Sequence, residues 1–167
     1  MLLAALESLP DDWKLIIAPH EIDLPHLNNI KALFGAQCAF YSSFDPGNAA
    51  KVLVIDNIGM LSALFKYGEI ACIGGGYNSS GIHNVLEPAI FGLPVIIGPE
   101  YQKFTEAVQL VKKGFAFVAK DPLSYTEMLL NLLKDNEGRH ALQGFIRTYM
   151  QEHKGATTKI ISLLPPL

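Results

Sequence analysis

The sequence predicts an α/β fold, a Rossmann-like open and mostly parallel sheet with helices on both faces. Short β-type runs alternate with segments of helical spacing along almost the whole chain. Half of the 167 residues are hydrophobic and only 17% are charged, a composition that favours a sheet covered on both faces. No repeat or linker interrupts the pattern, so we expect residues 1–167 to form a single domain.

The first part of the chain should alternate helix and strand. Apolar residues at helical spacing mark a first helix that ends at Pro10. Gly35 and Gly68 should stop two further helices, and Asp56 or Asn57 is placed to cap the second of them. The remaining predictions are strands over 13–18, 37–41 and 51–55, helices over 24–34 and 58–67, and a turn at 45–48.

The second part continues the alternation around a central unit. An apolar run at 70–73 meets Gly74-Gly75-Gly76, a short helical pattern runs from 84 to Gly92, and a second strand follows at 95–97. A strand, a glycine loop, a helix and a strand in this order make a parallel βαβ unit. Beyond it we predict a strand over 115–118 and helices over 101–113, 122–134, 138–152 and 156–164, with Asp121 capping the second of these helices.

Composition and cysteine spacing exclude several functions. The net charge is −3 without a basic block, which argues against nucleic-acid partners. No apolar run approaches the roughly 20 residues of a membrane span, and the apolar start lacks the basic residues of a signal peptide. Cys38 and Cys72 have no ligand spacing, so we expect small core residues in a reducing compartment, with no metal and no cofactor.

The glycine loop is the strongest candidate for binding a ligand. Glycines allow a close approach to the backbone, and the first amides of the following helix favour an anion. The spacing matches neither the dinucleotide pattern G-x-G-x-x-G nor a P-loop. From the pattern alone, a phosphate cradle and a plain turn remain equally open. Ligands in such sheets bind at the carboxyl ends of the strands, where we expect four segments to converge: Pro19-His20, Asp56 to Gly59, Gly74 to Asn84, and Gly98-Pro99.

Four blocks carry a more specific pattern: Ile73 to Gly76, Gly81 to Ala89, Gly92-Leu93-Pro94-Val95, and Gly98-Pro99 with Gln102-Lys103-Phe104. In these blocks the chain resembles 3-deoxy-D-manno-octulosonic acid (Kdo) transferases, bacterial glycosyltransferases of the two-domain GT-B architecture. The resemblance covers nearly all of this chain but only the carboxyl-terminal, donor-binding half of the family. It implies binding of the nucleotide-sugar CMP-Kdo and, in the intact enzyme, transfer of Kdo to a lipid A precursor in lipopolysaccharide biosynthesis.

The resemblance also implies which positions hold CMP-Kdo. The expected substrate-binding residues are Pro19, His20, Ile58, Gly59, Met60, Gly74, Gly75, Asn84, Val85, Leu86 and Glu87. Glu87 is expected to bind the ribose hydroxyls. Two positions depart from the family pattern, which usually has arginine in place of His20 and Met-Gly-Glu in place of Ile58-Gly59-Met60. His20 can still donate a hydrogen bond, but it is not a permanent cation.

Each of these residues also has a purely structural interpretation. Asn84 and Glu87 have the spacing of a capping box, in which Asn bonds the third helical amide and Glu reaches back. The three glycines would also allow close packing, and His83 would be an ordinary loop histidine. Lys103 would be either an exposed helical lysine or a contact to the donor carboxylate or phosphate.

No residue of this chain is a convincing general base, so we expect no catalytic residue in it. The resemblance implies that the base and the lipid acceptor site lie in an amino-terminal domain without a counterpart here. We expect the chain to begin just inside a domain boundary, so that one parallel strand is missing and its neighbours keep unpaired edges. We expect a soluble domain, with the intact enzyme at the cytoplasmic face of the bacterial inner membrane. The alternatives are a GT-B transferase that uses a UDP-sugar and a non-catalytic nucleotide-binding module.

Overall fold

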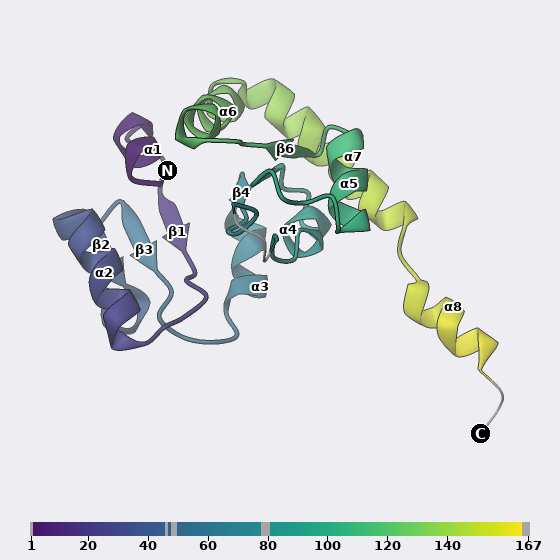
Figure 1. Cartoon of the computed structure of the whole chain (residues 1–167), viewed down its shortest axis with the longest axis horizontal. Helices are drawn as coiled ribbons and strands as arrows, with labels where there is room; N and C mark the ends of the chain where they lie inside the picture. The colour runs from purple at the N-terminus through teal and green to yellow at the C-terminus, as the bar shows by residue number, and fades with distance from the viewer. Residues whose placement is uncertain (1, 46, 48–49, 78–80, 165–167) are drawn as a thin grey trace.

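A computed structural model describes residues 2–45, 47, 50–77 and 81–164 (Figure 1). Every strand pair in it is parallel, and helices lie against the sheets, which confirms the predicted fold class. The described strands divide into two three-stranded sheets with the orders β1-β3-β2 and β4-β5-β6. The strands are β1 (Leu15–Ile17), β2 (Cys38–Phe40), β3 (Val52–Val54), β4 (Ala71–Cys72), β5 (Val95–Ile97) and β6 (Ala116–Val118).

Helices connect these strands and extend beyond the last one. They are α1 (Leu2–Ser8), α2 (Leu24–Phe34), α3 (Leu61–Leu64), α4 (Leu86–Ile90), α5 (Thr105–Lys112), α6 (Pro122–Lys134), α7 (Asn136–Glu152) and α8 (Ala156–Leu163). Short 3-10 helices lie at Gly35–Gln37, Tyr41–Ser43 and Phe65–Tyr67. Figure 1 shows α8 standing apart from the rest of the molecule. Among the described residues no helix is both long and apolar enough to cross a membrane.

The first sheet packs one face against α1 and α2. Val52 and Val54 are fully buried and share a core cluster with Leu6 of α1 and Phe34 of α2. Residues two apart in a strand point to the same face, so β3 places both valines toward these helices. Cys38 is buried in the same cluster, as the sequence predicts.

The second sheet is covered on both faces. All three residues of β5 are buried, and their side chains alternate between two core clusters. Val95 and Ile97 lie in a cluster that includes Leu110 of α5 and Ile146 of α7. Ile96 lies in a second cluster, built mainly by α6.

The segment that precedes β1 connects the two sheets. Leu9 packs against both the core cluster of the first sheet and that of the second, and α1 lies against α6. Trp13 joins the cluster beneath α6, where the Arg139 guanidinium lies 5.0 Å from the centre of its ring. The two sheets are therefore held together on one side by apolar contacts.

The structure corrects several details of the sequence analysis. The predicted helix over 58–67 begins only at Leu61, because Gly59 has a φ of +96°, outside the helical region. Asp56 does not cap it, since its carboxylate instead accepts hydrogen bonds from the Ser42 amide and hydroxyl. Cys72 is exposed on β4 rather than part of the core. The helix predicted from 101 begins at Thr105.

Two helices match their prediction to the residue. α2 begins after Asp23, which accepts a hydrogen bond from the His26 amide, and ends before Gly35. α6 begins after Asp121, which forms a capping box with Ser124 and is followed by proline. Part of the turn predicted at 45–48 lies outside the described residues, although the Gly47 amide donates to Asp45 at 2.9 Å.

Candidate functional site

The glycine loop after β4 turns back on itself. Gly75 and Ile82 form an isolated antiparallel bridge, and the Gly76 amide donates to the Gly81 carbonyl at 2.6 Å. Gly75, Gly76 and Gly81 have φ values between +74° and +87°, a conformation that side chains rarely adopt. The loop therefore needs glycine at these positions for its backbone path.

Close packing explains the inner side of this loop. A Cβ added at Gly98 would lie 2.6 Å from the carbonyl carbon and oxygen of Gly76, so the loop backbone lies directly against the end of β5. Gly74 differs, because a Cβ added there would meet nothing within 4 Å and the residue is exposed. Gly76 is therefore needed for close packing, whereas Gly74 has open space beside it and its carbonyl accepts from the His83 amide at 3.5 Å.

Asn84, Glu87 and Ser62 form a small polar cluster at the start of α4. The Asn84 amide Nδ2 donates to Glu87 Oε1 at 3.0 Å, and the Ser62 hydroxyl donates to Glu87 Oε2 at 3.1 Å. Asn84 Oδ1 accepts from the Leu86 amide at 3.0 Å. The capping box predicted for Asn84 and Glu87 is therefore wrong. Asn84 accepts from the Leu86 amide rather than from the third helical amide, and Glu87 accepts from side chains rather than reaching back to the backbone.

The structure weakens the expectation that the amino end of α4 binds an anion. The helix spans only Leu86–Ile90, and Val85 at its start is buried. A helix dipole grows with the number of aligned peptide units, so five residues give a weak one. One of the first amides, that of Leu86, is already bonded by Asn84.

Two histidines join the loops that follow β1 and β4. The rings of His20 and His83 stack with their centres 5.0 Å apart and their planes inclined by 28°. Both side chains are exposed, and Pro19 beside them is half-buried. The structure thus brings the Pro19-His20 segment to the glycine loop, as the sequence analysis expects.

The segment after β3 leads into α3, and α3 contacts the polar cluster at the start of α4. Met60 is the residue that precedes α3, and Ser62 within α3 contacts Glu87. Ile58 is 89% exposed and Gly59 is exposed beside it. Asn57 Nδ2 lies 2.9 Å from Met60 Sδ, a contact that holds the methionine side chain within the loop.

The fourth expected segment is tied to the glycine loop by its backbone. The Glu100 amide donates to the Gly76 carbonyl at 2.9 Å. Gln102 Nε2 donates to the Pro99 carbonyl at 2.8 Å, and Lys103 next to it is exposed in the turn before α5. Three of the four segments predicted at the carboxyl ends of the strands therefore adjoin one another, because Pro19-His20 and Gly98-Pro99 both lie against the glycine-loop segment. The Asp56 to Gly59 segment is linked to the site only through Ser62, three residues further on, which donates to Glu87.

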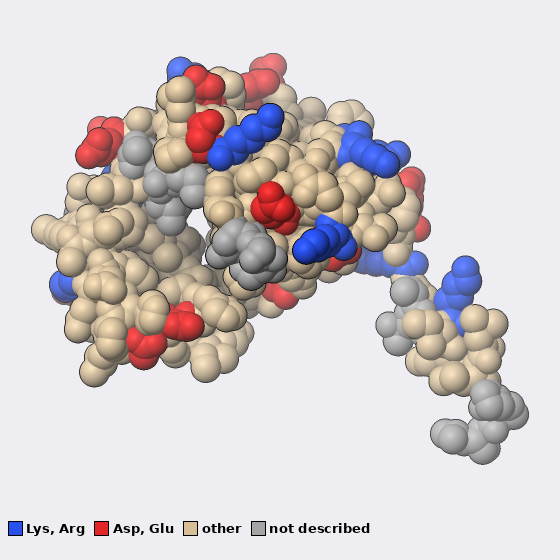
Figure 2. All heavy atoms as spheres, in the orientation of Figure 1, with Lys and Arg blue, Asp and Glu red and all other residues tan. Residues whose placement is uncertain are grey.

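The described residues show other clusters that do not belong to this site. Glu21, Asp23 and His26 have ligand atoms within 4.8 Å of one another, but all three are exposed and the His26 ring already bonds both carboxylates, at 3.0 and 2.8 Å. On the face in Figure 2, the Lys and Arg side chains of the described residues stand apart from one another.

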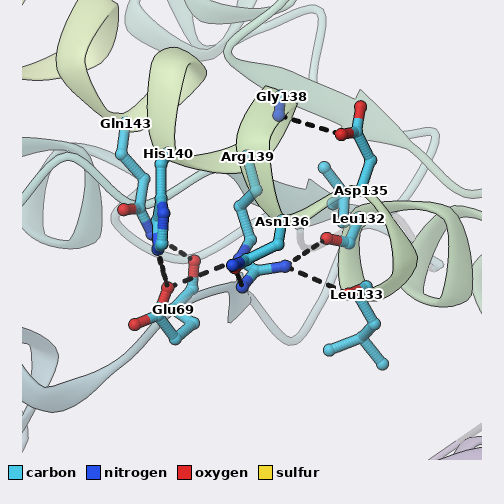
Figure 3. A network of polar contacts seen from close by, with 9 residues as sticks. All are labelled: Glu69, Leu132, Leu133, Asp135, Asn136, Gly138, Arg139, His140 and Gln143. Atoms are coloured by element: carbon cyan, nitrogen blue, oxygen red, sulfur yellow. Dashed lines mark hydrogen bonds and ion pairs between the residues drawn. The ribbon is translucent and has the colours of Figure 1, made fainter.

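A buried arginine network lies beneath the second sheet (Figure 3). Arg139 is 5% exposed and donates to the carbonyls of Leu132 and Leu133, to Asn136 and to Glu69. Gln143 donates to the Glu69 backbone and side chain, at 3.0 Å each. A cavity of about 310 Å³ adjoins this network between β6, α6 and α7, away from the glycine loop. All three nitrogens of the Arg139 guanidinium donate to protein acceptors, so we assign the network to stability.

Sequence reasoning missed Ser62, His83 as a ring partner and the Arg139 network. Their partners lie 25, 63 and 70 residues away along the chain, in the pairs Ser62–Glu87, His20–His83 and Glu69–Arg139. No local spacing signals such contacts.

Known proteins share sequence and fold with this chain. No family model matches the chain. The 3-deoxy-D-manno-octulosonic acid transferase of Aquifex aeolicus is 34% identical over 122 residues, which are 72% of this chain and 33% of that protein. The resemblance to Kdo transferases is confirmed. The Kdo transferase of Bordetella pertussis is 29% identical over 123 residues, 73% of this chain and 29% of that protein. The chain thus spans about a third of the length of the curated Kdo transferases that it matches.

A solved structure supports the architecture. The crystal structure of the carboxyl-terminal CMP-Kdo binding domain of WaaA from Acinetobacter baumannii aligns with a TM-score of 0.76 at 22% identity. The alignment covers 89% of this chain and 81% of that domain. The chain therefore has the fold of a carboxyl-terminal GT-B domain, as the sequence predicts.

Proposed function

We propose that this chain is the donor-binding domain of a Kdo transferase and that it binds CMP-Kdo at the crevice next to the glycine loop. The observation that carries the proposal is the position of Glu87, whose two carboxylate oxygens are oriented by Asn84 and Ser62 from two different segments. The confirmed resemblance to Kdo transferases and the likeness to a CMP-Kdo binding domain support it.

Glu87 has the remaining hydrogen-bonding capacity that a ribose requires. An ionised carboxylate offers about four lone-pair positions, and the described contacts use one on each oxygen. The two hydroxyls of a ribose can donate to the positions that remain, in charge-assisted hydrogen bonds. Asn84 and Ser62 then act as positioning residues for the carboxylate.

Gly74, His20 and His83 are proposed to face the phosphate. Gly74 leaves its backbone open, and the two exposed imidazoles can each donate a hydrogen bond to a phosphate oxygen. Pro19, Gly75 and the 58–60 segment, which the resemblance also assigns to CMP-Kdo, flank these groups. Stabilising the phosphate as it leaves would be this chain's contribution to transfer.

Our proposal for the complete Kdo transfer reaction rests only on the resemblance to Kdo transferases. We infer that the intact enzyme moves Kdo onto a lipid A precursor in lipopolysaccharide biosynthesis, at the cytoplasmic face of the inner membrane. A general base must deprotonate the acceptor hydroxyl, and we propose that it comes from outside these 167 residues. The isolated chain should therefore bind CMP-Kdo without transferring Kdo. Turnover of CMP-Kdo with a lipid A precursor by this chain alone would contradict that assignment.

A thermal-shift panel of CMP, UMP, UDP and ADP tests the donor. CMP present at about 100 times its Kd should stabilise the chain by about 2.7 kcal/mol, with UMP, UDP and ADP giving much smaller shifts. Stabilisation by UDP instead would favour a transferase that uses a UDP-sugar. A chain that responds to none of the four nucleotides would contradict donor binding and favour a module without this activity.

A further inference from the structure

The stacked rings of His20 and His83 lie in the crevice without a charged partner. Their centres are 5.0 Å apart and both side chains are exposed. None of the ion pairs among the described residues involves either ring. Imidazole is the side chain that ordinarily changes its charge between about pH 5 and 8. The charge at this point of the crevice can therefore respond both to the pH and to a bound ligand.

Permanent positive charge is scarce around this pair. In the four segments expected at the carboxyl ends of the strands and in residues 102–104 beside them, lysine and arginine occur once, as Lys103. Both arginines of the chain lie on α7. Arg139 is buried in its own network, and Arg147 lies against Gly92, beyond the end of α4. An anion in the crevice therefore depends on the two imidazoles for much of its countercharge.

The carboxylates of the same region do not pair with the two rings. Glu21 follows His20 in the chain, but its Oε2 lies 3.0 Å from the Nε2 of His26. The other carboxylates are Asp56 and Glu87, which accept hydrogen bonds from other residues, and Glu100, which is exposed. Among the described residues none of these carboxylates forms an ion pair with either imidazole. A negative charge on a ligand would thus be the first that the pair meets at close range.

A proton and a phosphate favour each other at such a pair. A neutral imidazole has one N–H donor and one acceptor nitrogen, whereas a protonated imidazole has two donors for the oxygens of a phosphate. Two charged rings 5.0 Å apart repel each other, and a phosphate that contacts both offsets this repulsion. Linkage is reciprocal, so a phosphate that promotes protonation is itself bound more tightly by the protonated pair.

We propose that the His20–His83 pair couples donor binding to proton uptake, so that the crevice gains about one proton when the phosphate of the nucleotide-sugar binds and loses affinity as the pH rises. The inference rests on the proposed function, because it concerns the same crevice. The protonated pair holds the phosphate with charge-assisted hydrogen bonds. Loss of the proton removes a donor and the charge together, which weakens the grip on the phosphate.

The methyl ester of CMP is the probe for this coupling. Its phosphodiester keeps one negative charge throughout the pH range used, whereas the second ionisation of the CMP monoester lies near about pH 6 and would add a pH dependence of its own. Calorimetry at about pH 7 in two buffers of different ionisation enthalpy gives the number of protons taken up. We expect about 0.5–1 proton, and binding about ten- to a hundredfold tighter at about pH 6 than at about pH 8.5.

Three variants assign the proton to the pair. His20→Arg supplies a cation that does not titrate, so it should retain tight binding at about pH 8.5 and take up fewer protons. The double variant His20→Gln with His83→Gln should take up no proton and bind with the same low affinity at both pH values. His140→Gln is the matched control, because His140 is an exposed histidine beside Glu69, in the network away from the glycine loop, and it should behave like the unmodified chain.

The outcomes separate this coupling from donor binding itself. Equal affinities at the two pH values without proton uptake would overturn the coupling and leave donor binding in place. Proton uptake that persists in the double glutamine variant would assign the proton to another group and also overturn the coupling. No binding of the methyl ester at either pH, by a chain whose circular dichroism shows that it is folded, would overturn both the coupling and the proposed function.

Discussion

Glu87 shows how one side chain can combine a structural role with the binding role that we propose for it. Its contacts to Asn84 and Ser62 fix the carboxylate between α3 and α4, two elements that belong to different parts of the chain. The sequence singles out Asn84 and Glu87 because their spacing is typical of a cap. It does not reveal Ser62, whose contact depends on how α3 packs.

Replacing Glu87 by glutamine should weaken CMP binding by about ten- to a hundredfold. Glutamine keeps the shape but loses the charge, and hydrogen bonds to charged groups contribute about 1.5–3 kcal/mol. Titration calorimetry of Glu87→Gln against the unmodified chain measures the change. Glu137→Gln is the matched control, since Glu137 also lies in the first turn of a helix, α7, and should leave binding intact. Equal affinities for the Glu87→Gln variant and the unmodified chain would contradict the ribose contact.

His26 should make part of the stability depend on pH. Its hydrogen bond to Asp23, aided by the charges of Asp23 and Glu21, raises the pKa of His26 above 6.5. The same bond lowers the pKa of Asp23 below 3.8. The stability that His26 contributes is fully present below the pKa of His26 in the unfolded chain, and it is lost as the pH rises through the pKa of His26 in the folded chain. The stability that Asp23 contributes is present above the pKa of Asp23 in the unfolded chain, and it is lost as the pH falls through the pKa of Asp23 in the folded chain.

His26→Gln should therefore destabilise the chain most between the two ordinary pKa values, 3.8 and 6.5, and less at higher pH. Urea unfolding at a series of pH values measures the difference. His153→Gln provides the control, because His153 bonds a backbone carbonyl rather than a carboxylate. A difference for His26→Gln that does not change with pH would exclude this coupling.

At the scale of elements, an aspartate cap closely followed by proline marks the helices whose starts are predicted accurately. α2 and α6 are correct to the residue because Asp23 and Asp121 accept bonds at the helix start and proline follows closely. α3 and α5 begin later than predicted, and for both the residue before the helix makes no side-chain cap. Hydrophobic spacing alone locates a helix but leaves its first turn undetermined.

Gly92 should be intolerant of any side chain. It has a φ of +84°, and a Cβ would lie 2.5 Å from Arg147 Cγ and 2.9 Å from the Gln143 carbonyl oxygen on α7. Gly92→Ala should lower the free energy of unfolding by about 2–4 kcal/mol through strain and overpacking. Gly144→Ala is the control within α7, where a Cβ meets nothing within 4 Å, and it should stabilise by up to about 1 kcal/mol. Equal effects of the two variants in chemical denaturation would show that α4 and α7 do not pack as described.

At the scale of the whole molecule, the sequence predicts parallel strands, which are observed in both sheets, and helices on both faces, which are observed for the second sheet. It does not predict which strands lie next to each other, since register between distant strands depends on packing rather than on local pattern. The contacts that hold the two sheets together, from Leu9 and Trp13 on one side and His20 with His83 on the other, are also invisible in local spacing.

The Arg139 network should contribute strongly to global stability. Arg139→Met keeps the aliphatic stem but removes the donor of two buried carbonyls and of Asn136 and one of the donors of Glu69, so we expect a loss of about 2–4 kcal/mol in the free energy of unfolding. Arg147→Met, at an exposed position of the same helix, should change it by no more than about 0.5 kcal/mol. Similar midpoints for both variants in denaturant would show that the network is not needed for folding.

The division into two sheets also has a consequence for synthesis. The first sheet uses only residues 15–54 and the second only residues 71–118, so neither waits for a strand from the other. Contacts between residues that are near in the chain form early, and domains emerge from the ribosome amino-terminal part first. The earlier half can thus assemble while the later half is still being translated, and the proposed nucleotide crevice is completed only when the two nascent parts meet.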